Sequence, residues 1–201
     1  MAELIYLVRH GMTQANAEKR FIGSSNPPLN ETGLAQARAL SEIFLKLTPE
    51  KVYCSPLLRV TQTAMNAMPD IEELSILEDL REVDFGEWEN LTQEEIIERA
   101  PERFAVMRGN HADFTFPGGE ALRDFIARVE RVADILKLDS SKSVAVFTHG
   151  GVIRYLACRL LGDGYEKTGE RYLPPGVVAV FQQNGDAYRV ASISGGWRWD
   201  S

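Results

Sequence analysis

The sequence predicts an α/β fold with three layers, in which a mainly parallel sheet is flanked by helices on both faces. Two observations lead to this prediction. First, the apolar runs "LIYLV" (4–8) and "SVAVF" (143–147) are continuous, which is typical of strands buried on both faces. Second, segments with apolar residues at helical spacing lie between the strand-like runs. Such a fold gathers its binding sites outside the carboxyl ends of the strands.

Length and composition predict a single domain over residues 1–201. The chain has 201 residues, 44% of them hydrophobic, which is enough for one sizeable core and too few for two full domains. The formal net charge of -7 excludes a broad nucleic-acid-binding surface, so any anion site is local. The first apolar run is too short for a signal sequence, and no stretch approaches the length of a membrane span. We therefore expect a cytoplasmic protein with no nucleic-acid or membrane partner.

The first half of the chain contains two predicted strand–helix pairs. The strand at residues 4–8 precedes "LNETGLAQARALSEIFLKL" (29–47), whose apolar residues recur at helical spacing after Asn30, a suitable N-cap. The run "KVYCSP" (51–56) predicts a short strand that ends at Pro56. The next segment (57–68) predicts a helix that ends before Pro69.

The second half begins with a less periodic stretch. Residues 87–118 are polar, contain two prolines and predict an insertion that covers the sheet end and contributes to substrate choice. A strongly periodic helix is expected at 119–138, followed by the strand 143–148 and a helix at 152–161. The last segment, 176–193, predicts two strands joined by an Asn-Gly turn.

Cysteine usage predicts free thiols. Cys54 and Cys158 are the two cysteines, they lie far apart, and each stands in an apolar segment. We expect buried, reduced thiols rather than a disulfide framework.

Two of the three histidines follow a predicted strand directly and precede a glycine. "LVRHG" contains Arg9, His10 and Gly11, and "VFTHGG" contains His149 and Gly150. In a parallel sheet both histidines would stand at the same edge, and each glycine would let backbone N–H groups approach a ligand. The third histidine, His111, is interpreted as structural.

Histidines beside arginines favour a phosphate site over a metal site. Neither histidine belongs to a close-spaced ligand pair such as His-Glu-x-x-His, and neighbouring guanidinium groups would repel a divalent cation. A guanidinium group instead donates paired hydrogen bonds to phosphate oxygens. Arg59, near the start of the helix after "YCSP", is a further candidate; taken alone it would be interpreted as a solvated helix residue.

Five motifs together resemble, in the right order, those of the histidine phosphatase superfamily, also called the phosphoglycerate mutase-like family. They are "RHGMTQAN", "NPPLNETGLAQA", "CSPLLRVTQTA", "LREVDFGEWEN" and "THGG", and the resemblance runs from Leu4 to about Leu161. It implies that His10 is the nucleophile, and that Glu82 donates a proton to the leaving group. It also implies a phosphate site with no metal and no cofactor, built from Arg9, Asn16, Arg59, His149 and Gly150.

The chemistry of phosphoryl transfer fits these roles. The reaction needs an in-line nucleophile, which a neutral imidazole supplies, and fixed positive charge around the phosphoryl oxygens. An alkoxide leaving group must be protonated as it departs, which a carboxyl group can do. Only the resemblance singles out Glu82, because Asp84, Glu87 and Glu89 lie nearby; by charge alone we interpret each of these as a solvated acid.

The sequence departs from the family pattern outside the phosphate site. The family often has threonine where Asn30 stands, an acidic residue at Asn26 and serine at Ala121. Asparagine and threonine both cap helices, so the change at Asn30 is structurally quiet.

We expect a phosphomonoesterase that acts on a small phosphorylated metabolite through a phosphohistidine. The alternatives are a cofactor-dependent phosphoglycerate mutase, whose family members are usually longer, and a non-catalytic module, which would have lost His10 or Glu82. The spacing of "FGEWEN" and "FTFPGGEALRDFIARVERV" resembles α-ribazole 5′-phosphate phosphatases. A homo-oligomer is compatible with the sequence. Candidate contacts for the rest of the substrate are Arg99, Arg103, Arg108, Trp88, Phe114, Phe116, Trp197 and Trp199.

Overall fold

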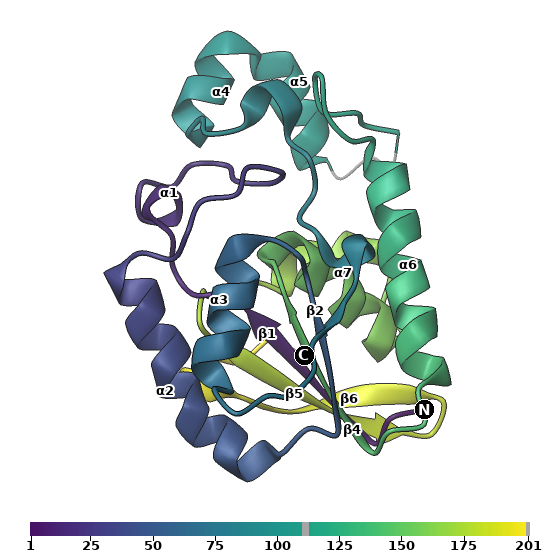
Figure 1. Cartoon of the computed structure of the whole chain (residues 1–201). Coiled ribbons are helices and arrows are strands. Elements are labelled where there is room, and N and C mark those ends of the chain that lie inside the picture. Colours follow the sequence, from purple (N-terminus) through teal and green to yellow (C-terminus); the bar gives the residue numbers. More distant parts are fainter. Residues whose placement is uncertain (110–112, 200–201) are drawn as a thin grey trace.

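A mixed β-sheet forms the centre of the protein (Figure 1). The computed structural model describes residues 1–109 and 113–199; His111 lies outside them. Within the described residues the sheet has six strands in the order β3-β2-β4-β1-β5-β6. The strands are β1 (Leu4–Arg9), β2 (Lys51–Cys54), β3 (Ser75–Ile76), β4 (Ser143–Thr148), β5 (Val178–Asn184) and β6 (Ala187–Ile193). Strands β1 to β4 run parallel to one another, and β5 pairs antiparallel with β1 on one side and with β6 on the other.

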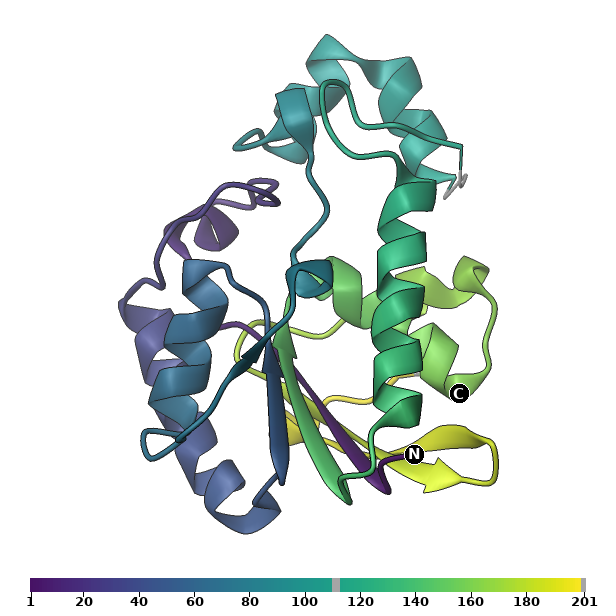
Figure 2. The ribbon, with the colours of Figure 1, turned by 45° about the vertical axis from the view of Figure 1, so that its right-hand side comes forward.

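Helices cover both faces of the sheet, so the predicted three-layer α/β fold is confirmed (Figure 2). The α-helices are α1 (Gln14–Ala17), α2 (Glu31–Leu47), α3 (Leu58–Ala67), α4 (Gln93–Arg99), α5 (Pro101–Arg108), α6 (Leu122–Leu138) and α7 (Gly150–Leu161). Helices α2 and α3 pack on one face, and α6 and α7 pack on the other. Helices α4 and α5 stand above the end of the sheet, in teal at the top of Figure 1.

The alternation of side chains along β1 explains the two layers of the core. Tyr6 and Val8 belong to the cluster that contains Leu40 of α2 and Val60 of α3. Ile5 and Leu7, together with Val129 of α6, belong to the opposite cluster. Successive strand side chains point to opposite faces, so a continuous apolar run serves both helical layers at once.

The parallel pairing of β1 with β4 brings the two histidine motifs together. Arg9 is in register with Thr148, the last residues of the two strands. The next residue, His10, continues this pairing, because its backbone N–H donates to the Thr148 carbonyl over 3.0 Å. His149 directly follows Thr148, so both histidines leave the sheet at one edge, as predicted.

Helix boundaries differ from the prediction at two helix starts. The helix expected from residue 119 begins at Leu122, because Ala121 is extended and forms a bridge with Thr115. The helix expected from Val152 begins two residues earlier, at Gly150, with His149 as its N-cap. Asn30 caps α2 as expected, accepting a hydrogen bond from the Gly33 amide over 2.9 Å.

The stretch 87–118 contains more regular structure than its weak periodicity indicated. Thr92 caps α4 through a capping box with Glu95, and Pro101 occupies the first turn of α5. Short elements such as α1 and β3 were also not predicted. In the described part of the chain, no helix is long and apolar enough to cross a membrane. Cys54 and Cys158 are buried free thiols, as expected.

Candidate active site

His10 stands at the carboxyl end of β1 with one ring nitrogen engaged and the other available. Its Nδ1 lies 2.7 Å from the carbonyl oxygen of Gly11. A carbonyl can only accept, so Nδ1 carries the proton and Nε2 of the neutral ring has the lone pair. The Gly11 amide is held in turn by Thr63 Oγ1 of α3 over 2.9 Å. The local chain therefore presents His10 in the tautomer that a nucleophile requires.

His149 lies beside His10 with its ring nearly perpendicular. The ring centroids are 5.2 Å apart. Nε2 of His149 is 2.9 Å from Ser55 Oγ, which itself accepts from the Leu57 amide. That hydroxyl has its hydrogen free for His149 Nε2, an arrangement that leaves the ring proton on Nδ1. Ser55, which holds His149 in this orientation, was not predicted, because a single serine after a strand carries no spacing signal.

Two arginines are fixed by backbone carbonyls. Arg9 donates from Nη1 to the Leu173 carbonyl over 2.7 Å. Arg59, on the first turn of α3, donates from Nη1 to the Ser25 carbonyl over 2.7 Å and from Nη2 to the Gly23 carbonyl over 2.9 Å. Arg59 has no solvent exposure, so it does not occupy the solvated helix position that the residue taken alone would indicate.

Three buried nitrogen atoms of this cluster have no hydrogen-bond partner among the described residues. They are Nε of Arg9, Nε of Arg59 and Nδ1 of His149. Leaving a buried donor unsatisfied costs free energy, and native proteins rarely do so without a functional reason. Their common neighbour is His10, on which both arginines act electrostatically. The arrangement is that of an anion site built around a histidine.

Burial and the two arginines keep both histidines uncharged. Burial, followed by the charges of Arg59 and Arg9, lowers the pKa of His10 well below its ordinary value. Burial and Arg59 act in the same way on the pKa of His149. Burial also lowers the pKa of Arg59, to about 10, which leaves its guanidinium charged at neutral pH. The site thus combines neutral imidazoles with permanent cations.

Glu82 reaches the site from the segment after β3. Its Oε2 accepts a hydrogen bond from the Gly151 amide over 2.9 Å, and its charge acts on Arg9 and Arg59. A Cβ on Gly151 would lie 2.2 Å from Glu82 Oε1, and a Cβ on Gly150 would lie 3.0 Å from Cζ of Arg9. The two glycines at the start of α7 therefore let a carboxylate and a guanidinium approach the helix N-terminus.

Asn16 has a local role in the structure. Its Oδ1 accepts hydrogen bonds from the backbone N–H and the hydroxyl of Thr13, in the capping box of α1. The carboxamide oxygen is thereby occupied, and the NH₂ group is the donor that remains for a ligand.

A cavity of about 620 Å³ extends from Arg9 and Glu82 toward α5 and α6. Aromatic side chains form part of its wall beside charged and polar ones, and Arg154 and Tyr172 contribute next to Arg9. The guanidinium groups of Arg9 and Arg154 lie 5.4 and 5.5 Å from the centre of the Tyr172 ring. Neither Arg154 nor Tyr172 was predicted, although Arg154 stands four residues after Gly150 and so on the same face of α7.

The other candidate contacts divide between the cavity and the core. Arg108 and Phe116 line the cavity, whereas Arg99 and Arg103 do not. Trp88 and Phe114 are buried and stack on each other with ring centroids 5.7 Å apart. The C-terminal tail docks near the cavity: Trp199 Nε1 donates to the Tyr172 carbonyl over 2.7 Å, and the Trp197 ring contacts the Tyr172 ring.

The acids near Glu82 have different surroundings. Glu87 is exposed, in line with a solvated acid. Asp84 and Glu89 are not solvated in this way, because each accepts hydrogen bonds from the loop at residues 23–25. That loop supplies the carbonyl groups that hold Arg59. No group of three or more His, Cys, Asp or Glu side chains suited to a metal ion occurs within residues 1–109 and 113–199.

Comparison with known protein families identifies the family of the chain. Residues 5–194 match the model of the histidine phosphatase superfamily (branch 1). The chain belongs to this superfamily. The resemblance drawn from the motifs is confirmed, and the assignment makes the chain an enzyme of a phosphatase family that acts through a histidine nucleophile.

Proteins similar to this histidine phosphatase are named for several different substrates. It is 35% identical over 164 residues to a metal-independent phosphoserine phosphatase of Arabidopsis thaliana, covering 78% of this chain and 68% of that one. It resembles the crystal structure of the α-ribazole phosphatase from Shigella flexneri with a TM-score of 0.86, 25% identity and 96% coverage of both chains. It is also 35% identical over 152 residues to a 6-phosphofructo-2-kinase/fructose-2,6-bisphosphatase of Caenorhabditis elegans. That match covers 75% of this chain and 32% of the length of the relative.

Proposed function

We propose that this histidine phosphatase hydrolyses the monoesters of small phosphorylated metabolites through a covalent phosphohistidine on His10. One observation carries the proposal: Arg9, Arg59 and His149, which act on or lie beside the uncharged His10 ring, each keep a buried nitrogen atom with no partner within the described residues, and His10 directs Nδ1 to the Gly11 carbonyl, which leaves the lone pair on Nε2. A tetrahedral dianion would satisfy these donors and bring its phosphorus to the nucleophile.

The residues divide the reaction between them. His10 Nε2 attacks the phosphorus as the bond to the ester oxygen breaks, and Glu82, which must be in its protonated form for this step, gives its proton to that departing oxygen and becomes the carboxylate. The two arginines and His149 stabilise the charge on the transferred group, together with the backbone N–H of Gly150 and the amide of Asn16. In the second step a water molecule, deprotonated by Glu82, attacks the phosphohistidine; inorganic phosphate leaves and neutral His10 returns.

We propose α-ribazole 5′-phosphate as the substrate to test first. The similarity to an α-ribazole phosphatase structure supports it, as does the aromatic part of the cavity wall, which suits a flat, largely apolar base. The similarity to a phosphoserine phosphatase supports phosphoserine as the second compound to test. Steady-state rates of phosphate release from both, beside other phosphorylated metabolites, rank the substrates.

Trapping the covalent intermediate tests the mechanism. Rapid acid-free quenching during turnover should yield a base-stable, acid-labile phosphate on His10. His10→Ala should abolish both this signal and turnover while the far-ultraviolet circular dichroism stays that of the wild type. Turnover of the His10→Ala protein at a near-normal rate would exclude the mechanism.

A mutase is the alternative, because the same phosphohistidine can pass its phosphoryl group to a bound acceptor instead of water. Incubation with 3-phosphoglycerate and its bisphosphorylated primer separates the two activities. A phosphatase releases inorganic phosphate or leaves the compound unchanged, whereas rapid isomerisation would establish a mutase. A non-catalytic module would bind phosphate esters without either outcome.

A further inference from the structure

We propose that Glu89 is a positioning residue for phosphate binding: it holds the loop at residues 23–25 in the conformation that aims Arg59 at the phosphoryl group. The inference rests on the proposed function, since it assigns Arg59 to the phosphate. It gives a role in the site to an acid that never needs to touch the substrate.

The carboxylate of Glu89 is surrounded by donors from the 23–25 loop. Its Oε1 accepts from the backbone amides of Gly23 and Ser24, each over 2.9 Å. Its Oε2 accepts from the Ser25 hydroxyl over 2.6 Å and from the Ser25 amide over 3.4 Å. Successive backbone N–H groups that face one anion form a nest, and charged hydrogen bonds of this kind are stronger than neutral ones.

The carbonyl groups of the same loop point at Arg59. Gly23 and Ser25 accept from the two terminal nitrogens of its guanidinium group, and these contacts occupy one edge of the fork. The guanidinium group is planar and its donors have fixed directions, so the position of these two carbonyls also sets the direction of Nε. Nε is the buried donor that has no partner within the described residues.

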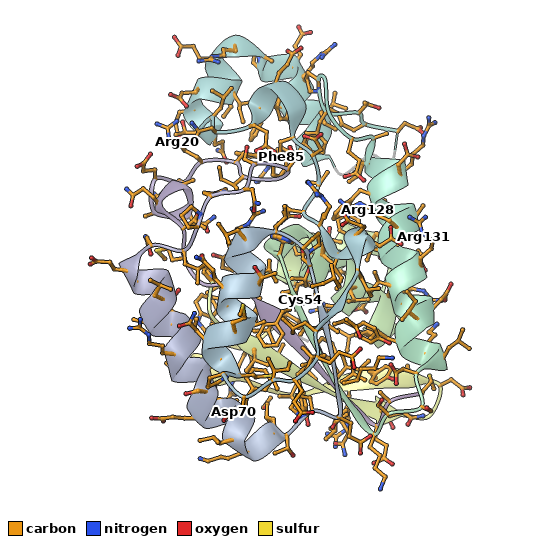
Figure 3. The ribbon with its side chains drawn as sticks, in the orientation of Figure 1. Arg20, Cys54, Asp70, Phe85, Arg128 and Arg131 are labelled. Atoms are coloured by element: carbon orange, nitrogen blue, oxygen red, sulfur yellow. The ribbon has the colours of Figure 1, made fainter. Side chains whose placement is uncertain are left out.

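The loop between Glu89 and Arg59 has little room to shift. A Cβ on Gly23 would lie 1.9 Å from the Val83 carbonyl oxygen and 2.6 Å from Glu89 Oε1. The Ser24 hydroxyl donates to Asp84 Oδ1 over 2.9 Å, which holds the loop a second time to the segment at residues 84–89 that contains Glu89. Figure 3 places Phe85, which lies between Asp84 and Glu89 in the chain, above the sheet and just below the helices at the top of the view. The Phe85 amide also donates to Glu89 Oε1 over 3.3 Å.

Electrostatics adds to the geometry. The negative charge of Glu89 acts on Arg59, whose guanidinium has no exposed surface. Glu89 therefore stabilises the charged arginine from behind, while two neutral carbonyl groups separate the carboxylate from the cation. An acid that paired directly with Arg59 would compete with the phosphate; an acid that acts through the loop does not.

The test is the inhibition constant of orthovanadate, a phosphate-like probe, in a double-mutant cycle on the full-length protein. Glu89→Gln should raise this constant roughly tenfold, because one acceptor and the negative charge are lost. Arg59→Ala should raise it further. In the Arg59→Ala background, Glu89→Gln should change the constant less than about twofold, because its target is already absent.

Glu87→Gln is the matched control, since it removes the same charge from the same segment at an exposed position outside the 23–25 loop. It should leave the inhibition constant and the hydrolysis rate at wild-type values. If Glu89→Gln does not fold, Ser25→Ala removes one partner of the carboxylate and should raise the constant in the same direction by a smaller factor.

Three outcomes separate the possibilities. Additive effects of Glu89→Gln and Arg59→Ala would overturn the inference, because they would show that Glu89 acts elsewhere. A Glu89→Gln protein with lower thermal stability and unchanged vanadate inhibition would also overturn it, leaving a purely structural role. A wild-type protein that hydrolyses no ester and binds no vanadate would instead overturn the proposed function.

Discussion

The charge state of His10 depends on its surroundings and has a consequence for stability. Burial and the neighbouring arginines lower the pKa of His10 and of His149 in the folded protein. In the unfolded chain each imidazole titrates near its ordinary pKa of 6.5. As the pH falls through that value, the unfolded chain therefore binds protons that the folded protein does not accept, and the folded state loses stability.

We predict that the contribution of the two histidines to the free energy of unfolding is nearly constant above pH 7 and decreases below pH 6.5. The decrease is roughly 1 kcal/mol per pH unit for each of the two histidines, from proton linkage. Urea denaturation at pH 7.5 and 5.5 measures it. His10→Gln and His149→Gln should each reduce the slope, and a slope unchanged in both variants would mean that the histidines titrate normally.

Glu82 is the residue whose assignment depends most on the family resemblance. If it protonates the leaving oxygen, Glu82→Gln should slow the hydrolysis of alkyl phosphates by roughly 10²- to 10⁴-fold. A nitrophenyl phosphate should suffer far less, since its phenolate leaves without a proton. The measurement is kcat/KM for both ester types.

Asp84→Asn, Glu87→Gln and Glu89→Gln are the controls for this prediction. None of the three should discriminate between the ester types. An equal loss for both esters in Glu82→Gln, or a selective loss in a control variant, would assign the proton donor elsewhere.

Individual site residues were predictable to different degrees. Arg9, His10 and His149 could be found because they stand at or directly after the ends of buried strands, and parallel strands end at one edge. Glu82 had no such signal among four acids and was identified by resemblance alone. The sequence favours a solvated position for Glu89, since nothing local in it shows that residues 23–25 fold back onto this side chain.

The N-terminus of α7 shows how one helix places two groups at once. Gly150 allows the guanidinium of Arg9 to approach, and Gly151 allows the carboxylate of Glu82 to approach. A methyl group at either position would displace a different partner. The two glycines therefore offer a way to disturb each group without changing its chemistry.

We predict that the two alanine substitutions in α7 change the hydrolysis rates and the vanadate inhibition in different ways. Gly151→Ala should displace the Glu82 carboxylate and slow alkyl phosphates by roughly tenfold or more, with a smaller effect on a nitrophenyl phosphate. Gly150→Ala should disturb Arg9, weaken orthovanadate inhibition and slow both esters alike. Rates for the two ester types and the vanadate constant distinguish them, and identical profiles would contradict the prediction.

Elements were predictable where periodicity was strong. Helices α2, α3 and α6 have long apolar faces, and the structure confirms them with boundary shifts of a few residues. Helices α4 and α5 are short and each buries a single side chain, Ile96 and Phe104, so their pattern is too weak to detect. Strand β3 has two residues and is held by pairing with β2 rather than by its own composition.

For the molecule as a whole, the proposed mechanism assigns to arginines the positive charge that a metal ion provides in other phosphatases. We predict that activity survives exhaustive treatment with a chelator, because Arg9 and Arg59 remain in place. Phosphate release before and after dialysis against the chelator measures this. A loss that a divalent cation restores would contradict it and point to a metal-dependent reaction.

The three layers of the molecule could be predicted from the sequence more readily than the cavity beside the end of the sheet. Alternating strands and helices predicted the three layers, because each sheet face must be covered. The cavity wall could be predicted only in part, as at Arg108 and Phe116, since it combines α5, α6, α7 and the segment near Tyr172, which are distant in the chain. Arg154 and Tyr172 meet through tertiary packing alone.

The unpartnered nitrogens of Arg9, Arg59 and His149 also affect the protein at rest. Positive charge and unsatisfied donors gathered in one buried place lower the free energy of unfolding, because the unfolded chain exposes the same groups to water. Any phosphate-like anion that binds only the folded form recovers this loss and raises the melting temperature with its concentration. The inorganic phosphate released by the reaction is such an anion. If these groups bind the substrate as proposed, they also bind the phosphate product, and we expect inorganic phosphate to inhibit turnover.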